Sequence, residues 1–375
     1  MKESKQTNNM NTQMSEYRPA IVFHPGEVLK EKLQELGLGI KEFAVRTGKP
    51  EQTISNVLNE KSSITPEMAV LFEAVTQIPA SFWQNKQARY DEYLAKQKRA
   101  QALASATEWA KKFPYAKMAS AGWVTATRKP IEKAEQLLSF FGIAVKEAWE
   151  EYFFNKRLAA HFRISLHGTK DPYALSAWIR QGERLASQQE VPAYDAKKLK
   201  KALPLIKSIM TTGAPDFWQQ VVVVLNSVGV KVVCVPCLPK VSASGVSRWI
   251  NNSPIIQVSD RMKRYDIFWF SLWHEIGHIL KHGTKYISVE NVEYDDRDME
   301  VENEANAFAA EWIFAEEEEQ QFVALGDFSR SVIIRFAAQV HTHPSLIAGR
   351  LVHKGYLTTQ AIVAMQLVPK VTIRL

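Results

Sequence analysis

The sequence predicts a multidomain protein with an all-α front half and an α+β back half. Apolar residues recur at helical spacing from His24 to about residue 209, whereas short runs rich in β-branched residues alternate with helical segments from Phe217 onward. The length of 375 residues suffices for two or three domains with separate cores. The predicted segments are a disordered leader (1–17), an N-terminal helical domain (18–100), a helical middle region (101–209) and a C-terminal domain with a small sheet (210–375).

The N-terminal domain shows the start and stop signals of successive helices. Pro25 suits the first turn of a helix that ends at Gly37. A second helix over residues 41–47 ends at the Gly48 turn, a third runs over 50–58, a fourth is capped by Thr65 and Pro66, and a fifth begins near Phe82 and Trp83. The side chains expected to face the core are Val28, Leu29, Leu33, Leu36, Ile40, Phe43, Ala44, Ile54, Val57, Leu58, Met68, Ala69, Leu71, Phe72 and Val75.

The second and third of these helices have the form of a helix-turn-helix motif. Reading of the major groove requires short polar side chains near the start of the second helix of such a motif. The side chains placed for base edges are Gln52, Thr53 and Asn56, and those placed for phosphates are Lys49, Ser55 and Lys61. On periodicity alone, a plain helical bundle with a solvated polar face explains the same pattern almost as well.

Short motifs in this region match a known family. They are residues 23–27, Leu33, Ala44, residues 47–48, residues 54–55, residues 65–69 and the pair Phe82–Trp83. Residues 22–94 therefore resemble the XRE-family fold of HigA-type antitoxins. The resemblance implies binding to promoter DNA, usually as a homodimer.

The remaining elements follow the same reasoning. Helical spacing continues through residues 103–209, where the pairs Leu137–Leu138 and Phe140–Phe141 indicate core positions and no chemistry. In the back half we expect strands at 221–225, 230–235 and 254–259, helices at 266–282 and 300–314, and helical spacing again over 328–356, with His341 and His343 in a turn between helices.

The segment His274-Glu275-Ile276-Gly277-His278 carries the strongest chemical signal. Histidines at i and i+4 lie on one helical face, so both imidazoles can reach one zinc ion. Glu275 projects at the edge of that face, where it can accept a proton from zinc-bound water. Gly277 costs a helix interior roughly 1 kcal/mol relative to alanine, which indicates that another backbone approaches closely there.

The third ligand is expected on the helix at 300–314. Glu302 and Asn306 are four residues apart and share a face, so Glu302 can bind the metal while Asn306 orients a ligand histidine. Glu304 is the competing ligand, but it faces about 160° away from Asn306, counting 3.6 residues per turn. His282 lies roughly 12 Å along the helix from His274 and is not expected to be a ligand.

Further residues around the motif match a second family. They are residues 268–270, His282–Gly283, Glu302, Ala305–Asn306, Phe308–Ala309, Arg248–Trp249, Ile255–Ile256 and Ser259. Residues 217–351 therefore resemble the ImmA/IrrE metallopeptidases, although residues 311–316 end without the leucine-methionine-proline common in that family. The resemblance implies a gluzincin-like zinc site and, as substrates, regulatory DNA-binding proteins such as XRE-type repressors.

Composition and charge fit such a protein. The net charge of +7 permits binding to nucleic acid without establishing it. Eight basic residues and one acid lie between residues 96 and 129, and thirteen acids and one base lie between residues 290 and 319. Each run is explained by a solvated surface, but together they fit a front half facing nucleic acid and a back half facing a metal or substrate.

The sequence favours a cytoplasmic protein without a membrane partner. Residues 1–18 are polar and lack the apolar core of a signal peptide, and the longest apolar stretch, residues 267–280, is too short to span a bilayer. Cys234 and Cys237 lack the second pair that a structural zinc site needs, so we expect them in a strand or core. The scarcity of cysteine fits a reducing compartment.

Together these features predict a zinc endopeptidase with a DNA-binding domain. Its expected substrate is a transcriptional repressor or related regulatory protein in a toxin-antitoxin, phage or stress-response setting, held as an added strand at residues 254–259. The alternative is a DNA-binding repressor or antitoxin whose peptidase-like domain acts as a sensor or scaffold without turnover. Glu275 favours the enzyme, because a scaffold needs no general base.

Overall fold

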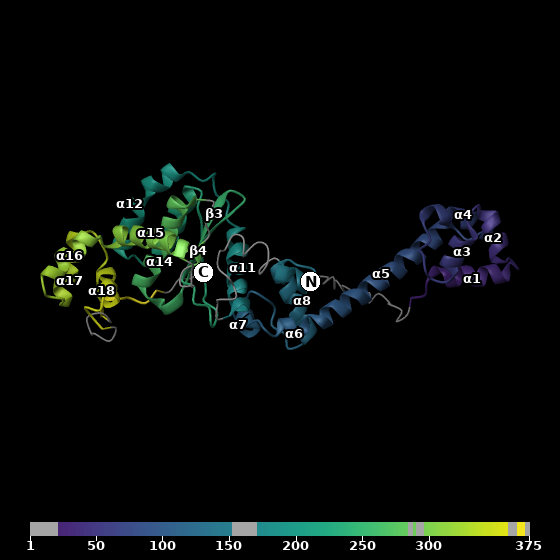
Figure 1. The fold of residues 1–375 in the computed structure, drawn as a ribbon, viewed down its shortest axis with the longest axis horizontal. Coiled ribbons are helices and arrows are strands. Elements are labelled where there is room, and N and C mark those ends of the chain that lie inside the picture. The colour runs from purple at the N-terminus through teal and green to yellow at the C-terminus, as the bar shows by residue number, and fades with distance from the viewer. Residues whose placement is uncertain (1–21, 152–170, 284–287, 290–295, 359–365, 372–375) are drawn as a thin grey trace, which may run out of the picture. The chain divides into compact units, whose positions relative to one another are not determined.

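The computed structural model describes residues 22–151, 171–283, 288–289, 296–358 and 366–371 (Figure 1). The chain divides into two compact units, Met1–Ala102 and Leu103–Leu375. The predicted leader at 1–17 lies outside the described residues. The boundary expected between residues 209 and 210 falls inside the second unit, and the three-way division stays a prediction.

The first unit is helical, as predicted. Its described helices are α1 (Pro25–Glu35), α2 (Ile40–Thr47), α3 (Glu51–Leu58), α4 (Pro66–Thr76) and most of α5 (Ala80–Ser105), which continues into the second unit. Gly48 ends α2 with a φ of 64°, a left-handed conformation that glycine adopts without strain. The Thr65 hydroxyl accepts a hydrogen bond from the Met68 amide at 3.2 Å and so caps α4.

The core of this unit contains most of the side chains expected there. Its buried members are Leu29, Leu33, Phe43, Ala44, Ile54, Val57, Ile64, Met68, Ala69, Phe72 and Trp83. Leu36 and Ile40 were also expected to face inward, but they are 41% and 38% exposed. Leu36 is the C-cap of α1 and Ile40 is the first residue of α2, so both lie at helix ends rather than in the central turns that hold an apolar stripe against the core.

The second unit is built on a sheet with strand order β1-β3-β2-β4. The strands are β1 (Lys231–Val235), β2 (Gly245–Ile250), β3 (Ser253–Ser259) and β4 (Ser288–Val289). β3 runs parallel to β1 and antiparallel to β2, so both of its edges are hydrogen-bonded within the sheet. The expectation that residues 254–259 accept a substrate as an added strand is therefore wrong, since strand addition needs an open edge.

One predicted strand is a helix. Residues 221–225 lie in α13 (Phe217–Ser227). A strand would place Val221, Val223 and Leu225 on one face, yet Val221 and Leu225 are fully buried while Val223 is 69% exposed. Burial thus follows the helical spacing of i and i+4, and packing overrides the preference of valine for strands.

The sheet is covered on both faces. One face packs on α6 (Thr107–Ala110), α7 (Tyr115–Ser120), α8 (Pro130–Phe141), α9 (Lys146–Glu150) and α11 (Pro172–Ala186). Side-chain hydrogen bonds join α11 to the sheet: the Trp178 indole donates to the Val235 carbonyl at 3.1 Å, the Gln257 amide donates to the Trp178 carbonyl at 2.8 Å, and the Arg248 guanidinium donates to the Ile179 carbonyl at 3.0 Å. The helical middle region thus shares a core with the C-terminal strands.

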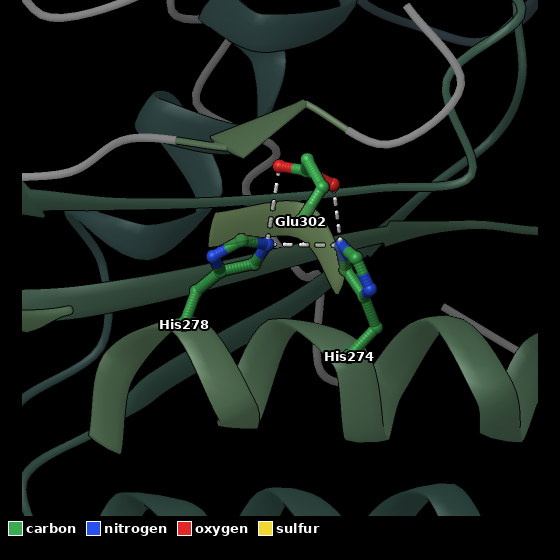
Figure 2. Close-up of side chains that lie close together, drawn as sticks. All are labelled: His274, His278 and Glu302. Carbon is green, nitrogen blue, oxygen red and sulfur yellow. Dashed lines mark hydrogen bonds and ion pairs between the residues drawn. The ribbon is translucent and has the colours of Figure 1, made fainter. Parts of the chain in front are cut away.

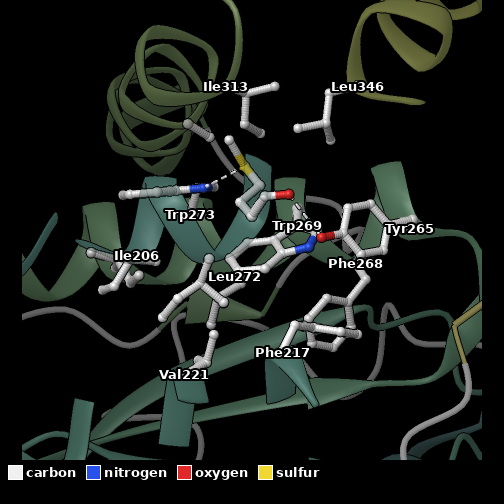
Figure 3. Close-up of a cluster of buried hydrophobic side chains, with 14 of the residues drawn as sticks. Ile206, Phe217, Val221, Tyr265, Phe268, Trp269, Leu272, Trp273, Ile313 and Leu346 are labelled. Carbon is white, nitrogen blue, oxygen red and sulfur yellow. Dashed lines mark hydrogen bonds between the residues drawn. The ribbon is translucent and has the colours of Figure 1, made fainter. Parts of the chain in front are cut away.

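The other face carries the helices of the predicted metal site. They are α12 (Ala196–Thr212), α13, α14 (Tyr265–Lys281), α15 (Asp296–Ile313), α16 (Glu316–Ala324), α17 (Arg330–Gln339) and α18 (Pro344–His353). Figure 3 shows aromatic side chains of α14, including Phe268, Trp269 and Trp273, in this core. His341 and His343 lie between α17 and α18, as predicted.

Both cysteines are free thiols, and Cys234 is buried in β1 while Cys237 follows the strand. Within the described ranges, no helix combines the length and apolarity needed to cross a membrane.

Candidate metal centre

Three side chains predicted to bind metal converge in the second unit (Figure 2). His274 and His278 come from α14 and Glu302 comes from α15. Nε2 of His274 lies 3.2 Å from one oxygen of Glu302, and Nε2 of His278 lies 3.4 Å from the other. The two Nε2 atoms are 2.9 Å apart. These ligand atoms all lie within 4.8 Å of one another.

The donor set fits a zinc ion. Nδ1 of His274 lies 2.9 Å from Oδ1 of Asn306, the residue expected to orient a ligand histidine. If this nitrogen donates to the amide oxygen, Nε2 carries no hydrogen and presents its lone pair toward Glu302. Two imidazole nitrogens and a carboxylate are the three protein ligands of many catalytic zinc sites, which keep one position open for water or substrate.

Burial favours the metal-binding forms of these side chains. Burial lowers the pKa of His278 to about 4, although the neighbouring Glu302 carboxylate acts in the opposite direction. Burial alone would raise the pKa of Glu302, but hydrogen bonds with His274 and His278 outweigh it and hold the pKa well below its usual range. At neutral pH His278 is therefore uncharged and Glu302 is ionised, as ligation requires.

Glu275 lies on the same helix and is completely buried. Its carboxylate contacts the backbone of Gly245 on β2: a Cβ atom built on Gly245 would lie 2.6 Å from Oε1 of Glu275. Gly277 likewise faces a close neighbour, since a Cβ there would lie 3.0 Å from the Phe308 ring on α15. A close approach at Gly277 is confirmed, but the expectation that a backbone makes it is wrong, because the atoms nearest to a Cβ there belong to the Phe308 side chain of α15, the helix that carries Glu302.

His282 and Glu304, which were considered as metal ligands and not preferred, lie next to the three converging side chains. Nδ1 of His282 is 3.0 Å from Nδ1 of His278, and Nε2 of His282 is 3.0 Å from Oε2 of Glu304. Neither belongs to the group of three side chains that face one point. Sequence reasoning did not foresee this arrangement, although the spacing of four residues from His278 to His282 was a signal for it.

The residues expected to contact DNA lie on or beside α3 in the first unit. Gln52 is exposed, and its amide donates a hydrogen bond to Oδ1 of Asn56 at 2.9 Å. Lys49 forms an ion pair with Glu67 at 2.6 Å. Of the others, Thr53 and Ser55 are half-buried and Lys61 is exposed. Contact of these side chains with DNA stays a prediction.

Two family models match the chain. The IrrE N-terminal-like domain of the M78 peptidases matches residues 228–335, a range that contains the strands β1–β4 and the helices α14 and α15. A helix-turn-helix model matches residues 29–83.

Curated relatives match over a small part of the chain. Virulence-associated protein A of Dichelobacter nodosus is 44% identical over 69 residues, which make up 18% of this chain and 68% of that protein. The uncharacterized HTH-type transcriptional regulator YddM of Escherichia coli strain K12 is 35% identical over 63 residues, or 17% of this chain and 67% of that protein.

Solved structures also match over a small part of the chain. A putative antidote protein of a plasmid maintenance system from Nostoc punctiforme is 33% identical and has a TM-score of 0.20, with 20% of this chain and 84% of that chain covered. An addiction module antidote protein of the HigA family from Coxiella burnetii is 28% identical and has a TM-score of 0.21, with 22% and 92% covered.

Proposed function

Because the chain belongs to the XRE-type helix-turn-helix family and joins that domain to an IrrE/ImmA-like M78 peptidase domain, we propose that it is a zinc-dependent endopeptidase. The observation that carries the proposal is the convergence of His274, His278 and Glu302 on one point, beside a buried glutamate. Such a donor set would hold a metal ion through three protein ligands, as in many catalytic zinc sites.

Each residue has a separate role in the proposed reaction. Zinc held by His274, His278 and Glu302 would supply Lewis-acid activation, lowering the pKa of a coordinated water to about 7. Glu275 would accept a proton as water adds to the scissile carbonyl carbon, and would return that proton to the leaving amine as the C–N bond breaks. Asn306 would keep His274 in its metal-binding orientation through the 2.9 Å contact.

The surroundings of Glu275 support its role as general base. The side chain is fully buried between α14 and the Gly245 backbone, so the group that takes the proton is held in one place away from bulk water. Groups fixed in a water-poor site stabilise developing charge without having to reorient during the reaction. A structural glutamate at this position would be costly to bury.

The helix-turn-helix domain suggests where the peptidase acts. We propose that it binds promoter DNA as a homodimer through α3 and that the substrate is a transcriptional repressor or related regulatory protein. Tethering to DNA raises the effective concentration of the peptidase near proteins bound at adjacent sites.

The test is cleavage of XRE-type repressors encoded in the same genome by the purified, zinc-loaded chain, with Glu275→Gln as the matched control. We expect both proteins to bind one zinc ion and only the wild type to produce defined fragments, identified by mass spectrometry. Equal cleavage by Glu275→Gln would refute the proposed general base.

A second candidate function is a DNA-binding repressor or antitoxin without turnover. The observation in its favour is that the two curated relatives described above match 18% and 17% of this chain, and that one of them is named an HTH-type transcriptional regulator. Promoter binding by a chain that loads zinc but cleaves none of these repressors would support it.

A further inference from the structure

We propose that His282 and Glu304 are positioning residues, which hold His278 in the orientation that binds metal. The observation behind this inference is a chain of two contacts that starts at His278 and leads away from the metal cluster: 3.0 Å from Nδ1 of His278 to Nδ1 of His282, and 3.0 Å from Nε2 of His282 to Glu304. The inference rests on the proposed function, because it concerns a ligand of the proposed zinc.

The positions of the hydrogens follow from the geometry. Nε2 of His278 faces Nε2 of His274 and an oxygen of Glu302, so a metal-binding His278 carries its hydrogen on Nδ1. That N–H then donates to Nδ1 of His282, which must lack a hydrogen. His282 consequently carries its hydrogen on Nε2, where it donates to the Glu304 carboxylate. Every hydrogen is assigned without conflict, and the chain ends on a negative charge.

The two ligand histidines are thus supported in different ways. Asn306 on α15 contacts Nδ1 of His274 directly. For His278 the corresponding partner is His282, which caps the C-terminal end of the same helix, α14. Its spacing of four residues from His278 places the two rings on one helical face. Glu304 connects this partner to α15, so both helices of the site contribute to holding each ligand.

The different burial of His282 and Glu304 predicts that they contribute unequally to metal binding. The His282 side chain is only 9% exposed, so its hydrogen bond with His278 is protected from water. The Glu304 side chain is 53% exposed, and solvent screens its interaction with His282. Loss of His282 should therefore weaken metal binding more than loss of Glu304. Changes of such supporting partners typically weaken metal binding about 10- to 100-fold.

The experiment compares His282→Leu, His282→Asn and Glu304→Ala with the full-length wild type. The dissociation constant for Zn²⁺ is measured by competition with a chromogenic chelator, and the visible spectrum of the Co²⁺-loaded protein reports ligand geometry. We expect His282→Leu to weaken zinc binding about 10- to 100-fold and Glu304→Ala to weaken it less. His282→Asn should recover most of the affinity, because the asparagine oxygen can accept the hydrogen from Nδ1 of His278.

The unfolding temperature of the metal-free proteins distinguishes the proposed positioning of His278 from a purely structural role of His282. We expect it to be nearly the same in wild type and His282→Leu. The inference is overturned if His282→Leu binds zinc as tightly as wild type, if His282→Asn is as weak as His282→Leu, or if the loss of affinity accompanies an equal loss of metal-free stability. A wild type that takes up no zinc would overturn the proposed function as well, whereas a wild type that binds one zinc with unaffected variants would overturn this inference alone.

Discussion

The backbone of Gly245 lies directly against the carboxylate of Glu275. A Cβ atom at Gly245 would lie 2.6 Å from Oε1 and 2.9 Å from Cγ of the glutamate, closer than a side-chain carbon can approach without displacing its neighbour. The Gly245 backbone does not adopt a positive φ, so space rather than conformation requires glycine here. The first residue of β2 therefore helps to define where the proposed general base lies.

We predict that Gly245→Ala impairs hydrolysis while zinc binding persists. The added methyl group must push the Glu275 carboxylate away, and a displacement of about 1 Å in a catalytic group can cost on the order of 100-fold in rate. The zinc ligands lie on other residues, so metal content should stay near one ion per chain. Steady-state cleavage and elemental analysis of the same preparations check this, and a variant with the wild-type rate would show that Glu275 has room to move.

Alanine variants of Glu302 and Glu304, two glutamates on α15, test which residue is the third metal ligand. Glu302→Ala should abolish stoichiometric zinc binding, because the Glu302 carboxylate lies 3.2 Å and 3.4 Å from the two histidine nitrogens. Glu304→Ala removes the same chemical group two residues away and should retain one zinc per chain. Elemental mass spectrometry on freshly purified proteins measures both. Retention of zinc by Glu302→Ala would mean that another residue completes the site.

Two variants of Asn306 test whether its contact with His274 strengthens zinc binding. Asn306→Leu keeps the size of the side chain but removes the oxygen that lies 2.9 Å from Nδ1 of His274, and we expect zinc affinity to fall about 10- to 100-fold. Asn306→Asp keeps an acceptor at that point and should bind zinc at least as tightly as wild type. Equal losses in both variants would indicate that packing, rather than the hydrogen bond, explains the effect.

Local patterns in the sequence predicted the elements that carry the site. Spacings of i and i+4 identified α14 and α15, and they paired His274 with His278 and Glu302 with Asn306, because helical geometry fixes which side chains of one helix share a face. Asn251 and Asn252, both with positive φ, form the hairpin turn that joins β2 to β3, and two adjacent asparagines are a sequence signal for such a turn.

Features that depend on long-range packing could not be predicted from local patterns in the sequence. The valines of α13 prefer strands intrinsically, and only the core below Val221 and Leu225 makes them helical. The central place of β3 follows from how strands pair, which the periodicity of a single segment does not report. The contact of Gly245 with Glu275 joins residues thirty positions apart through the packing of a strand on a helix.

The acid sensitivity of the metal-free chain should depend on His278. Its pKa is about 4 when folded and 6.5 as the unperturbed value, so between these pH values the unfolded chain binds more protons than the folded chain. The resulting stabilisation is complete above about pH 6.5 and is lost as the pH falls towards 4. Between pH 7 and pH 5 the wild type should lose about 2 kcal/mol more of its free energy of unfolding than His278→Gln.

Chemical denaturation of both metal-free proteins at the two pH values measures this difference. Burial also lowers the pKa values of His24 and His343, but these histidines are present in both proteins, so their contributions cancel in the comparison. Parallel losses of stability in wild type and variant would show that His278 titrates normally in the folded chain.

DNA binding should separate the roles of Gln52 and Lys61. Gln52 is exposed on α3 and hydrogen-bonded to Asn56, a pair suited to a base edge, so Gln52→Ala should weaken binding to the chain's own promoter by about 1–3 kcal/mol and leave binding to a scrambled duplex unchanged. Lys61 is exposed just after α3, and Lys61→Ala should weaken binding to both duplexes and reduce the salt slope by about 1. Fluorescence anisotropy over a series of salt concentrations measures both effects. If Gln52→Ala binds the two duplexes as the wild type does, α3 does not read bases through this residue, whereas an unchanged salt slope in Lys61→Ala would remove that lysine from the phosphate contacts.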